Sequence, residues 1–99
     1  MDVKLVNRGE EGELILSGDL DTRTARDADK LFAQLATRFN KIILNMQNLN
    51  YISSAGIRTI RNLYLLLMKS GGKLDIINVN GNVMEVFEMT GLAGLLNIR

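Results

Sequence analysis

Two adjacent serines, Ser53 and Ser54, carry the hydroxyl groups best placed for chemistry in this sequence. They follow the apolar pair Tyr51 and Ile52 and precede a long run of helix-forming residues, so they fall where a strand would turn into a helix. A serine there can cap the helix, because its oxygen accepts a backbone N–H group of the first turn. A phosphate is also favoured there, because the helix start offers unpaired N–H groups and the positive end of its dipole. Two serines exceed what one cap needs, so both roles stay open.

Catalysis by either serine would need partners that this chain does not have. A serine hydrolase uses a general base, usually histidine, and a G-x-S-x-G turn, and the sequence contains neither. It also contains no cysteine, which excludes disulfides, a zinc-thiolate site and a thiol nucleophile. No glycine-rich phosphate loop appears. The sequence therefore predicts a protein that is not an enzyme, with no catalytic residue, no metal site and no cofactor.

Two aspartates, Asp19 and Asp21, form a second candidate site. Asp21 or Thr22 would cap the helix that follows, because acidic side chains suit the positive end of a helix dipole. Clustered carboxylates could instead hold Mg²⁺ and accept phosphate, as they do in receiver domains. That hypothesis needs an aspartate after a later strand, where this chain has Gln47 and Asn48. The receiver-domain hypothesis therefore fails at its central residue.

The helix after the serines carries two features that a partner could recognise. Arg58 and Arg61 follow the serines by one and two helical turns, and they form either an ordinary solvated face or a charged patch. The apolar run Leu63–Met68 belongs mostly to the expected core, but Leu65 and Met68 fall off its main stripe. Facing outward, they would mark a partner surface, and burial against another helix is the alternative.

The elements that must position these residues follow from a hydrophobic pattern that switches between strand and helix periods. Four short segments have the pattern of strands, and three longer ones have the spacing of helices. In chain order they are a strand at 3–6, a strand ending at Gly18, a helix from Asp21 or Thr22 to about Arg38, a strand at 41–46, a helix at 54–69, a strand at 73–79 and a helix within 80–91. Residues 92–99 fit a last helical turn, an edge strand, or both.

The order β-β-α-β-α-β-α predicts an α/β fold, a single small domain over residues 1–99 with a mixed sheet of four to five strands. Strands that alternate with helices are parallel and joined by right-handed crossovers, whereas the opening hairpin is antiparallel. The adjacent isoleucines in 41–46 indicate a central strand covered on both faces. Functional groups in such sheets gather beyond the carboxyl ends of strands, which are the loops 18–22 and 48–56 here.

Composition narrows the classes of partner. Hydrophobic residues make up 46% of the 99 residues and charged residues 23%, which is typical of a globular protein. A net charge of +1 gives no reason to expect nucleic acid or an anionic membrane as a partner. No apolar run is long enough for membrane insertion and no signal peptide is visible, so we expect a cytoplasmic protein.

Four segments match a known family in order and spacing: GDLDTRTA, KIILNMQNLNYISSAGIRTI, SGGKLDIINV and VMEVFEMTGLAGLLNI. Over essentially its whole length, the chain resembles the STAS-domain anti-sigma-factor antagonists of bacteria. The motifs that carry this resemblance are the G-x-L-D segment, the strand–S-S-x-G–helix junction and the late F-x-M-T/S-G-L. The resemblance implies a small mixed sheet with helices packed on it, in agreement with the order above.

The resemblance also implies a phosphoprotein that regulates transcription through partner switching. The unphosphorylated antagonist binds an anti-sigma factor that is also a serine kinase of the histidine-kinase-like ATPase type, and this frees the sigma factor. The kinase releases the antagonist by phosphorylating a serine at the helix start, and a PP2C-type phosphatase resets the switch. The family motif D-S-[ST]-G places the acceptor at Ser54, with Ser53, where the family has aspartate, as second choice. The partner surface that the resemblance implies consists of Asp21, Ser53, Ser54, Ala55, Gly56, Arg58 and Arg61.

Other roles for the same fold stay open. A small STAS protein can brace the ATPase of a lipid-transport ABC system, and that role needs no phosphorylation. A scaffold in a stress-sensing assembly is a further alternative, although such proteins usually carry additional domains. A free-standing domain for nucleotides or small molecules is disfavoured, because the chain has no glycine-rich phosphate loop.

Overall fold

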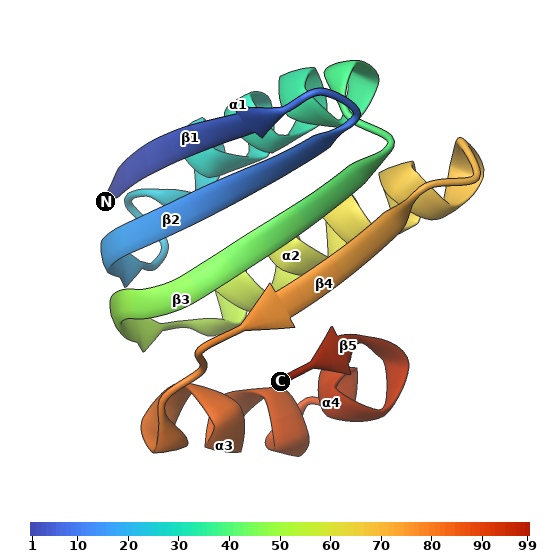
Figure 1. Cartoon of the computed structure of the whole chain (residues 1–99). Coiled ribbons are helices and arrows are strands. Elements are labelled where there is room, and N and C mark those ends of the chain that lie inside the picture. Colours follow the sequence, from blue (N-terminus) through green and yellow to red (C-terminus); the bar gives the residue numbers. More distant parts are fainter.

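Five strands and four helices form the chain, and the computed structural model describes all of its residues, 1–99. In chain order the elements are β1 (Asp2–Arg8), β2 (Glu11–Leu20), α1 (Ala25–Arg38), β3 (Lys41–Ile52), α2 (Ser54–Lys69), β4 (Lys73–Ile77), α3 (Gly81–Met89), α4 (Leu92–Leu95) and β5 (Asn97–Ile98). The predicted order is confirmed (Figure 1). The C-terminal segment forms both a helical turn and an edge strand, so the last of the three options for it is correct.

The strands form one mixed sheet in the order β1-β2-β3-β4-β5. The β1–β2 hairpin is antiparallel, and each later pair is parallel because helices return the chain to the same end of the sheet. Figure 1 shows α1 and α2 behind the sheet and α3 and α4 beside β4 and β5. The carboxyl ends of β2 and β3 therefore lie at one edge, with the starts of α1 and α2 directly after them.

The apolar core lies between the sheet and its helices. Leu14 and Leu16 of β2 and Ile42 and Leu44 of β3 are fully buried, and they alternate with residues that point to the opposite face. That opposite face of β1–β4 carries no helix (Figure 1), and Ile43 on it is only half-buried. The prediction that this strand is covered on both faces is therefore wrong, because only one isoleucine of the adjacent pair faces the core.

Hydrogen bonds and ion pairs satisfy the polar residues of the uncovered face. The Asp75 side chain is only 1% exposed, and its carboxylate accepts a hydrogen bond from Asn97 Nδ2 at 2.8 Å and pairs with Lys41 Nζ at 3.4 Å. Burial raises the pKa of Asp75, but the hydrogen bonds from Asn97 and Lys41 and the charges of Lys73 and Lys41 outweigh it and lower this pKa below its usual value. Nearby, Asn45 Nδ2 donates to Glu13 Oε2 at 3.1 Å. A polar network thus replaces a second helical layer on this face.

The strands β2 and β3 extend further than predicted, to Leu20 and Ile52 instead of positions 18 and 46. Two register shifts in the β2–β3 pairing, on either side of Ser17–Gly18, keep the strands together past the regular ladder. Leu49 and Ile52 are buried and continue the core to this edge. Most of the two predicted loops is therefore strand. The strand β4 is shorter than predicted, because Asn78 turns the chain with a positive φ of 59°.

Candidate functional site

The two predicted sites meet at the edge where β2 and β3 end. Leu20 lies opposite Ile52 in the pairing, and the backbone N–H of Ser53 donates to the carbonyl oxygen of Leu20 at 3.0 Å. Asp21 is the next residue after Leu20. The start of α2 and the turn before α1 are therefore held side by side by main-chain pairing, as expected for groups beyond the carboxyl ends of parallel strands.

Ser53 is the cap of α2. Its backbone is extended, with φ −102° and ψ 177°, and its Oγ accepts the N–H of Gly56 at 3.4 Å. Its carbonyl oxygen accepts the N–H of Ile57 at 2.9 Å, which is the first bond of the helix. The half-buried Ser53 thus has the structural role that the sequence left open between the two serines.

Ser54 is the first residue of α2, and its side chain is exposed. Ser53 and not Ser54 provides the capping oxygen, so the Ser54 hydroxyl is left to face solvent beside the N–H groups of the first turn. This arrangement gives the two serines different chemistry: one is held in the fold and the other is accessible to a second protein. Ala55, the next residue, is half-buried.

Gly56 is buried against the end of β2. A Cβ atom at this position would lie 2.6 Å from the carbonyl oxygen of Leu20 and 2.8 Å from Cγ1 of Ile52, both well inside van der Waals contact. Only glycine therefore lets the helix begin at this distance from the strand. Gly56 therefore contributes to the predicted partner surface indirectly, because its close contact with β2 determines the position of the exposed Ser54.

Asp21 closes the turn before α1. Its Oδ1 accepts the N–H groups of Arg23 at 2.9 Å and Thr24 at 3.2 Å, and its own N–H donates to Thr24 Oγ1 at 3.0 Å. Desolvation raises the pKa of Asp21, but the hydrogen bonds from the Thr24 and Arg23 backbones outweigh it, so the pKa lies below its usual value. Asp21 is therefore a charged carboxylate at the site. It caps this turn, while α1 itself begins later than predicted, at Ala25.

A buried hydroxyl that sequence reasoning missed joins the starts of the two helices. Thr59 is 1% exposed, and its Oγ1 lies 3.2 Å from the carbonyl oxygen of Ala55 and 3.5 Å from that of Ala25. A threonine one turn after a helix start has no distinctive pattern in sequence, because the bond across to α1 depends on how the two helices pack.

Three further exposed side chains lie on the elements that flank the serines. Arg58 and Arg61 are exposed on α2, and neither is in an ion pair within the chain. Tyr51 is 54% exposed at the end of β3, where it lies opposite Asp19 in the pairing. Sequence reasoning treated Tyr51 only as part of an apolar pair, but strand alternation with the buried Ile52 was the signal that it faces outward. An exposed tyrosine is a residue type enriched in the energetic centres of protein interfaces.

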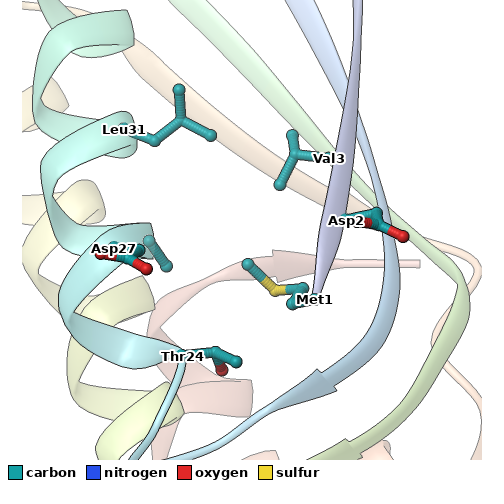
Figure 2. Close-up of a pocket in the computed structure, with 7 residues that line it drawn as sticks. Met1, Asp2, Val3, Thr24, Asp27 and Leu31 are labelled. Atoms are coloured by element: carbon teal, nitrogen blue, oxygen red, sulfur yellow. The ribbon is translucent and has the colours of Figure 1, made fainter.

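A hollow of about 330 Å³ adjoins the Asp21 turn, between the start of β1 and the first turns of α1 (Figure 2). Its lining residues are Met1, Asp2, Val3, Thr24, Asp27, Ala28 and Leu31. Figure 2 shows the Met1 side chain reaching from β1 toward α1. Thr24 is shared between this hollow and the hydrogen bonds of Asp21. The hollow therefore connects the Asp21 turn with the N-terminal strand β1.

Neither a metal-binding cluster nor a membrane-spanning helix is found in the structure. No three or more His, Cys, Asp or Glu side chains gather into a group that could hold a metal ion. None of the helices has the length and apolar character needed to cross a membrane.

Comparisons with known proteins give one consistent family. Residues 4–99 match the STAS domain family. The anti-sigma F factor antagonist of Paenibacillus polymyxa is 29% identical over 99% of this chain and 87% of that protein. The structure of the anti-sigma factor antagonist SpoIIAA in its unphosphorylated form superposes with a TM-score of 0.79, at 17% identity over 99% of this chain and 87% of that one. The phosphorylated form of the Bacillus protein SpoIIAA gives a TM-score of 0.78, at 19% identity over 99% and 91%.

Proposed function

The chain belongs to the STAS domain family, and from that premise we propose that it is an anti-sigma factor antagonist controlled by phosphorylation of Ser54. In its unphosphorylated form it binds an anti-sigma factor that is also a kinase of the histidine-kinase-like ATPase type. Phosphorylation releases that partner, and a PP2C-type phosphatase restores binding. The role is regulatory and not catalytic, and it places the protein in the cytoplasm.

One observation carries the choice of Ser54. Ser53 Oγ is engaged as the cap of α2, whereas Ser54 is exposed at the first position of the same helix. A kinase must reach the oxygen that it modifies, and Ser53 is only half-buried with its Oγ in contact with the N–H of Gly56, whereas Ser54 is exposed. The geometry therefore favours Ser54 as acceptor, although the family motif D-S-[ST]-G that the chain resembles would have an aspartate at Ser53.

The proposed switch acts on the interface and not on the fold. A phosphate adds a charge of about −1.5 to −2 and three acceptor oxygens. The N-terminus of α2 is the positive end of the helix dipole and favours that charge, so phosphorylation should not unfold the helix. Support comes from SpoIIAA, whose unphosphorylated and phosphorylated forms resemble this chain equally, with TM-scores of 0.79 and 0.78. A desolvated phosphate facing a partner costs several kcal/mol, and about 1.4 kcal/mol corresponds to a tenfold change in affinity.

The proposed partner surface surrounds Ser54. Asp21 contributes a carboxylate whose lowered pKa keeps it charged, and Arg58 and Arg61 contribute cations without intrachain partners. We add Tyr51 to the predicted set, because it is exposed just before the serines. A phosphate on Ser54 would add its negative charge to that of Asp21 at the same junction, so an acidic partner surface would meet less repulsion in the unphosphorylated state.

The decisive experiment maps the phosphate. The chain is incubated with its purified kinase partner and Mg-ATP, and the modified residue is identified by mass spectrometry in wild type, Ser53→Ala and Ser54→Ala. We expect one phosphate on Ser54 in wild type and in Ser53→Ala, and none in Ser54→Ala. Phosphate on Ser53, or a Ser54→Asp variant that binds the kinase as tightly as wild type, would refute the proposal. Stable binding to a permease-associated ATPase without phosphorylation would favour the ABC-system role.

A further inference from the structure

Helix α2 exposes apolar side chains at the end far from the serines. Leu65, Leu66 and Met68 are 50%, 41% and 43% exposed. They are three of the seven large hydrophobic side chains that the chain exposes, so this exposure is concentrated in four consecutive positions. The outward orientation that the sequence left open for Leu65 and Met68 is thereby confirmed. An exposed apolar patch of this kind marks an interaction surface.

Two adjoining shallow hollows lie along this surface, one over α2 alone and one between α1 and α2. The first has a volume of about 520 Å³ and the second, between α1 and α2, about 380 Å³. Leu66 and Lys69 line both hollows, so together they form one groove, which we call the α1/α2 groove. Its lining residues are Asn62, Leu65, Leu66, Lys69 and Ser70 from α2 and its end, and Ala33, Ala36 and Thr37 from α1. The short alanine side chains of α1 leave room opposite Leu66.

The charges around the α1/α2 groove are mainly positive. Arg61 and Lys69 lie one helical turn before and after Leu65, and neither is paired within the chain. The helix α2 contains no aspartate or glutamate. On the α1 side, charges of opposite sign stand next to each other, Asp29 with Lys30 in sequence and Glu10 with Arg38 around an adjoining hollow. No carboxylate of the chain pairs with Arg61 or Lys69, and α2 itself supplies none, so these two cations are available to carboxylates of a partner.

We propose that the α1/α2 groove binds an acidic amphipathic helix of a partner protein. The apolar stripe of that helix enters the groove against Leu65 and Leu66, and its carboxylates lie beside Arg61 and Lys69. The hollow between α1 and α2 fits a helical ridge better than the flat surface of a membrane, because side chains line it from both helices. The stretch from Asn62 to Lys69 is about 10 Å long at roughly 1.5 Å per residue, which matches two turns of a bound helix.

This docking surface lies apart from Ser54 and shares only Arg61 with the partner surface proposed around that serine. Eleven positions along α2 separate Ser54 from Leu65, which is about 17 Å along the helix axis. Solvent screening reduces the influence of a phosphate across that distance, since the Debye length is about 8 Å at physiological salt. The groove therefore holds its partner in both states of Ser54, and it does not depend on the proposed function.

The test uses a synthetic helical peptide as probe. Isotope-labelled full-length protein is titrated with an amphipathic peptide of about four turns that has leucines on one stripe and glutamates beside them, and amide shifts are followed by NMR. The matched control peptide has lysine in place of each glutamate. We expect shifts at Ala33, Ala36 and Leu66 with the acidic peptide only, and binding that weakens several-fold as salt is raised.

Substitution of two side chains with similar exposure, Leu66 and Met68, distinguishes binding in the groove from non-specific hydrophobic binding. Leu66→Gln should weaken peptide binding about tenfold, because the transfer of one leucine side chain into an interface is lost. Met68→Gln removes an equally exposed apolar side chain that does not line the groove, and it should leave binding unchanged. Ser54→Asp should also bind the acidic peptide normally, which keeps this result distinct from any failure of the phosphorylation switch.

Three outcomes would overturn the proposal. The first is equal binding of the acidic and basic peptides. The second is Leu66-dependent binding to vesicles of phosphatidylglycerol and phosphatidylcholine without peptide binding, which would make the groove a membrane contact. The third is concentration-dependent self-association in sedimentation experiments that Leu66→Gln abolishes, which would assign the surface to a second copy of the chain.

Discussion

Replacing Gly56 with alanine tests how the junction places Ser54. The new methyl group would lie 2.6 Å from the Leu20 carbonyl oxygen and 2.8 Å from Ile52 Cγ1, where ordinary contacts are 3.4–4 Å. Neither neighbour can move aside freely, because Leu20 is 0% and Ile52 is 2% exposed and the Leu20 oxygen already accepts the Ser53 N–H. The strand and the helix must therefore separate by several tenths of an ångström at least.

The cost of Gly56→Ala follows from these contacts. Overpacking a close-packed site costs about 1–3 kcal/mol, and the clash with a main-chain atom places this case at the upper end. The higher helix propensity of alanine offsets about 1 kcal/mol of that destabilisation. We therefore expect a net loss of about 2 kcal/mol in the free energy of unfolding. For a domain of this size that corresponds to a fall in Tm of roughly 8–16 °C.

Urea denaturation followed by circular dichroism measures this loss, with Gly81→Ala as the matched control. Gly81 is also at a helix start, but a Cβ there meets nothing within 4 Å. That control should be neutral or stabilising by up to about 1 kcal/mol. A Gly56→Ala variant within about 0.5 kcal/mol of wild type would refute the reasoning. It would show that α2 is not held against β2 at this point, and the argument for the position of Ser54 would fall with it.

Three more predictions concern stability. Ser53→Ala should lower the free energy of unfolding by about 0.5–1 kcal/mol through loss of the cap, whereas Ser54→Ala should change it little; equal effects in urea denaturation would contradict the assignment of the cap. Thr59→Val should lower the free energy of unfolding by about 1 kcal/mol, because it removes a buried hydroxyl that donates to the carbonyl oxygens of Ala55 and Ala25; thermal unfolding measures this loss. The folded-state pKa of Asp75 is below its ordinary 3.8, so its contribution is present above that value and is lost as pH falls. Stability should therefore decline from about pH 5 to pH 2, and less steeply in Asp75→Asn; a parallel decline would disprove this role.

The uncovered sheet face shows why burial could not be read from one strand at a time. In the run KIILNM three apolar residues, Ile42–Leu44, follow one another without alternation, and that pattern is typical of a strand between two layers. In the structure the outward residues Ile43 and Asn45 lie beside polar partners from neighbouring strands, including Glu13 and Asp75. Those partners come from positions far apart in sequence, so the polar groups of this face find their hydrogen-bond partners only when the sheet assembles.

The ends of β2 and β3 show a similar limit. Local turn residues such as Gly18 suggested that the strand stops, and Gly18 does have a positive φ of 95°. The pairing continues because register shifts let β2 and β3 stay aligned to Leu20 and Ile52. Whether a glycine ends a strand or forms a bulge within it depends on the neighbouring strand, which local propensity does not describe.

The amino-acid sequence by itself determined the order of elements, the mixed sheet and the position of the junction, because periodicity and turn residues act over a few neighbouring positions. It also carried the family motifs around Ser53 and Ser54. Only the tertiary structure decided which serine caps the helix and which is exposed. That choice depends on the hydrogen bond between Ser53 at the end of β3 and Leu20 of β2, and on how closely Gly56 lets α2 approach β2. Both are contacts between segments distant in sequence.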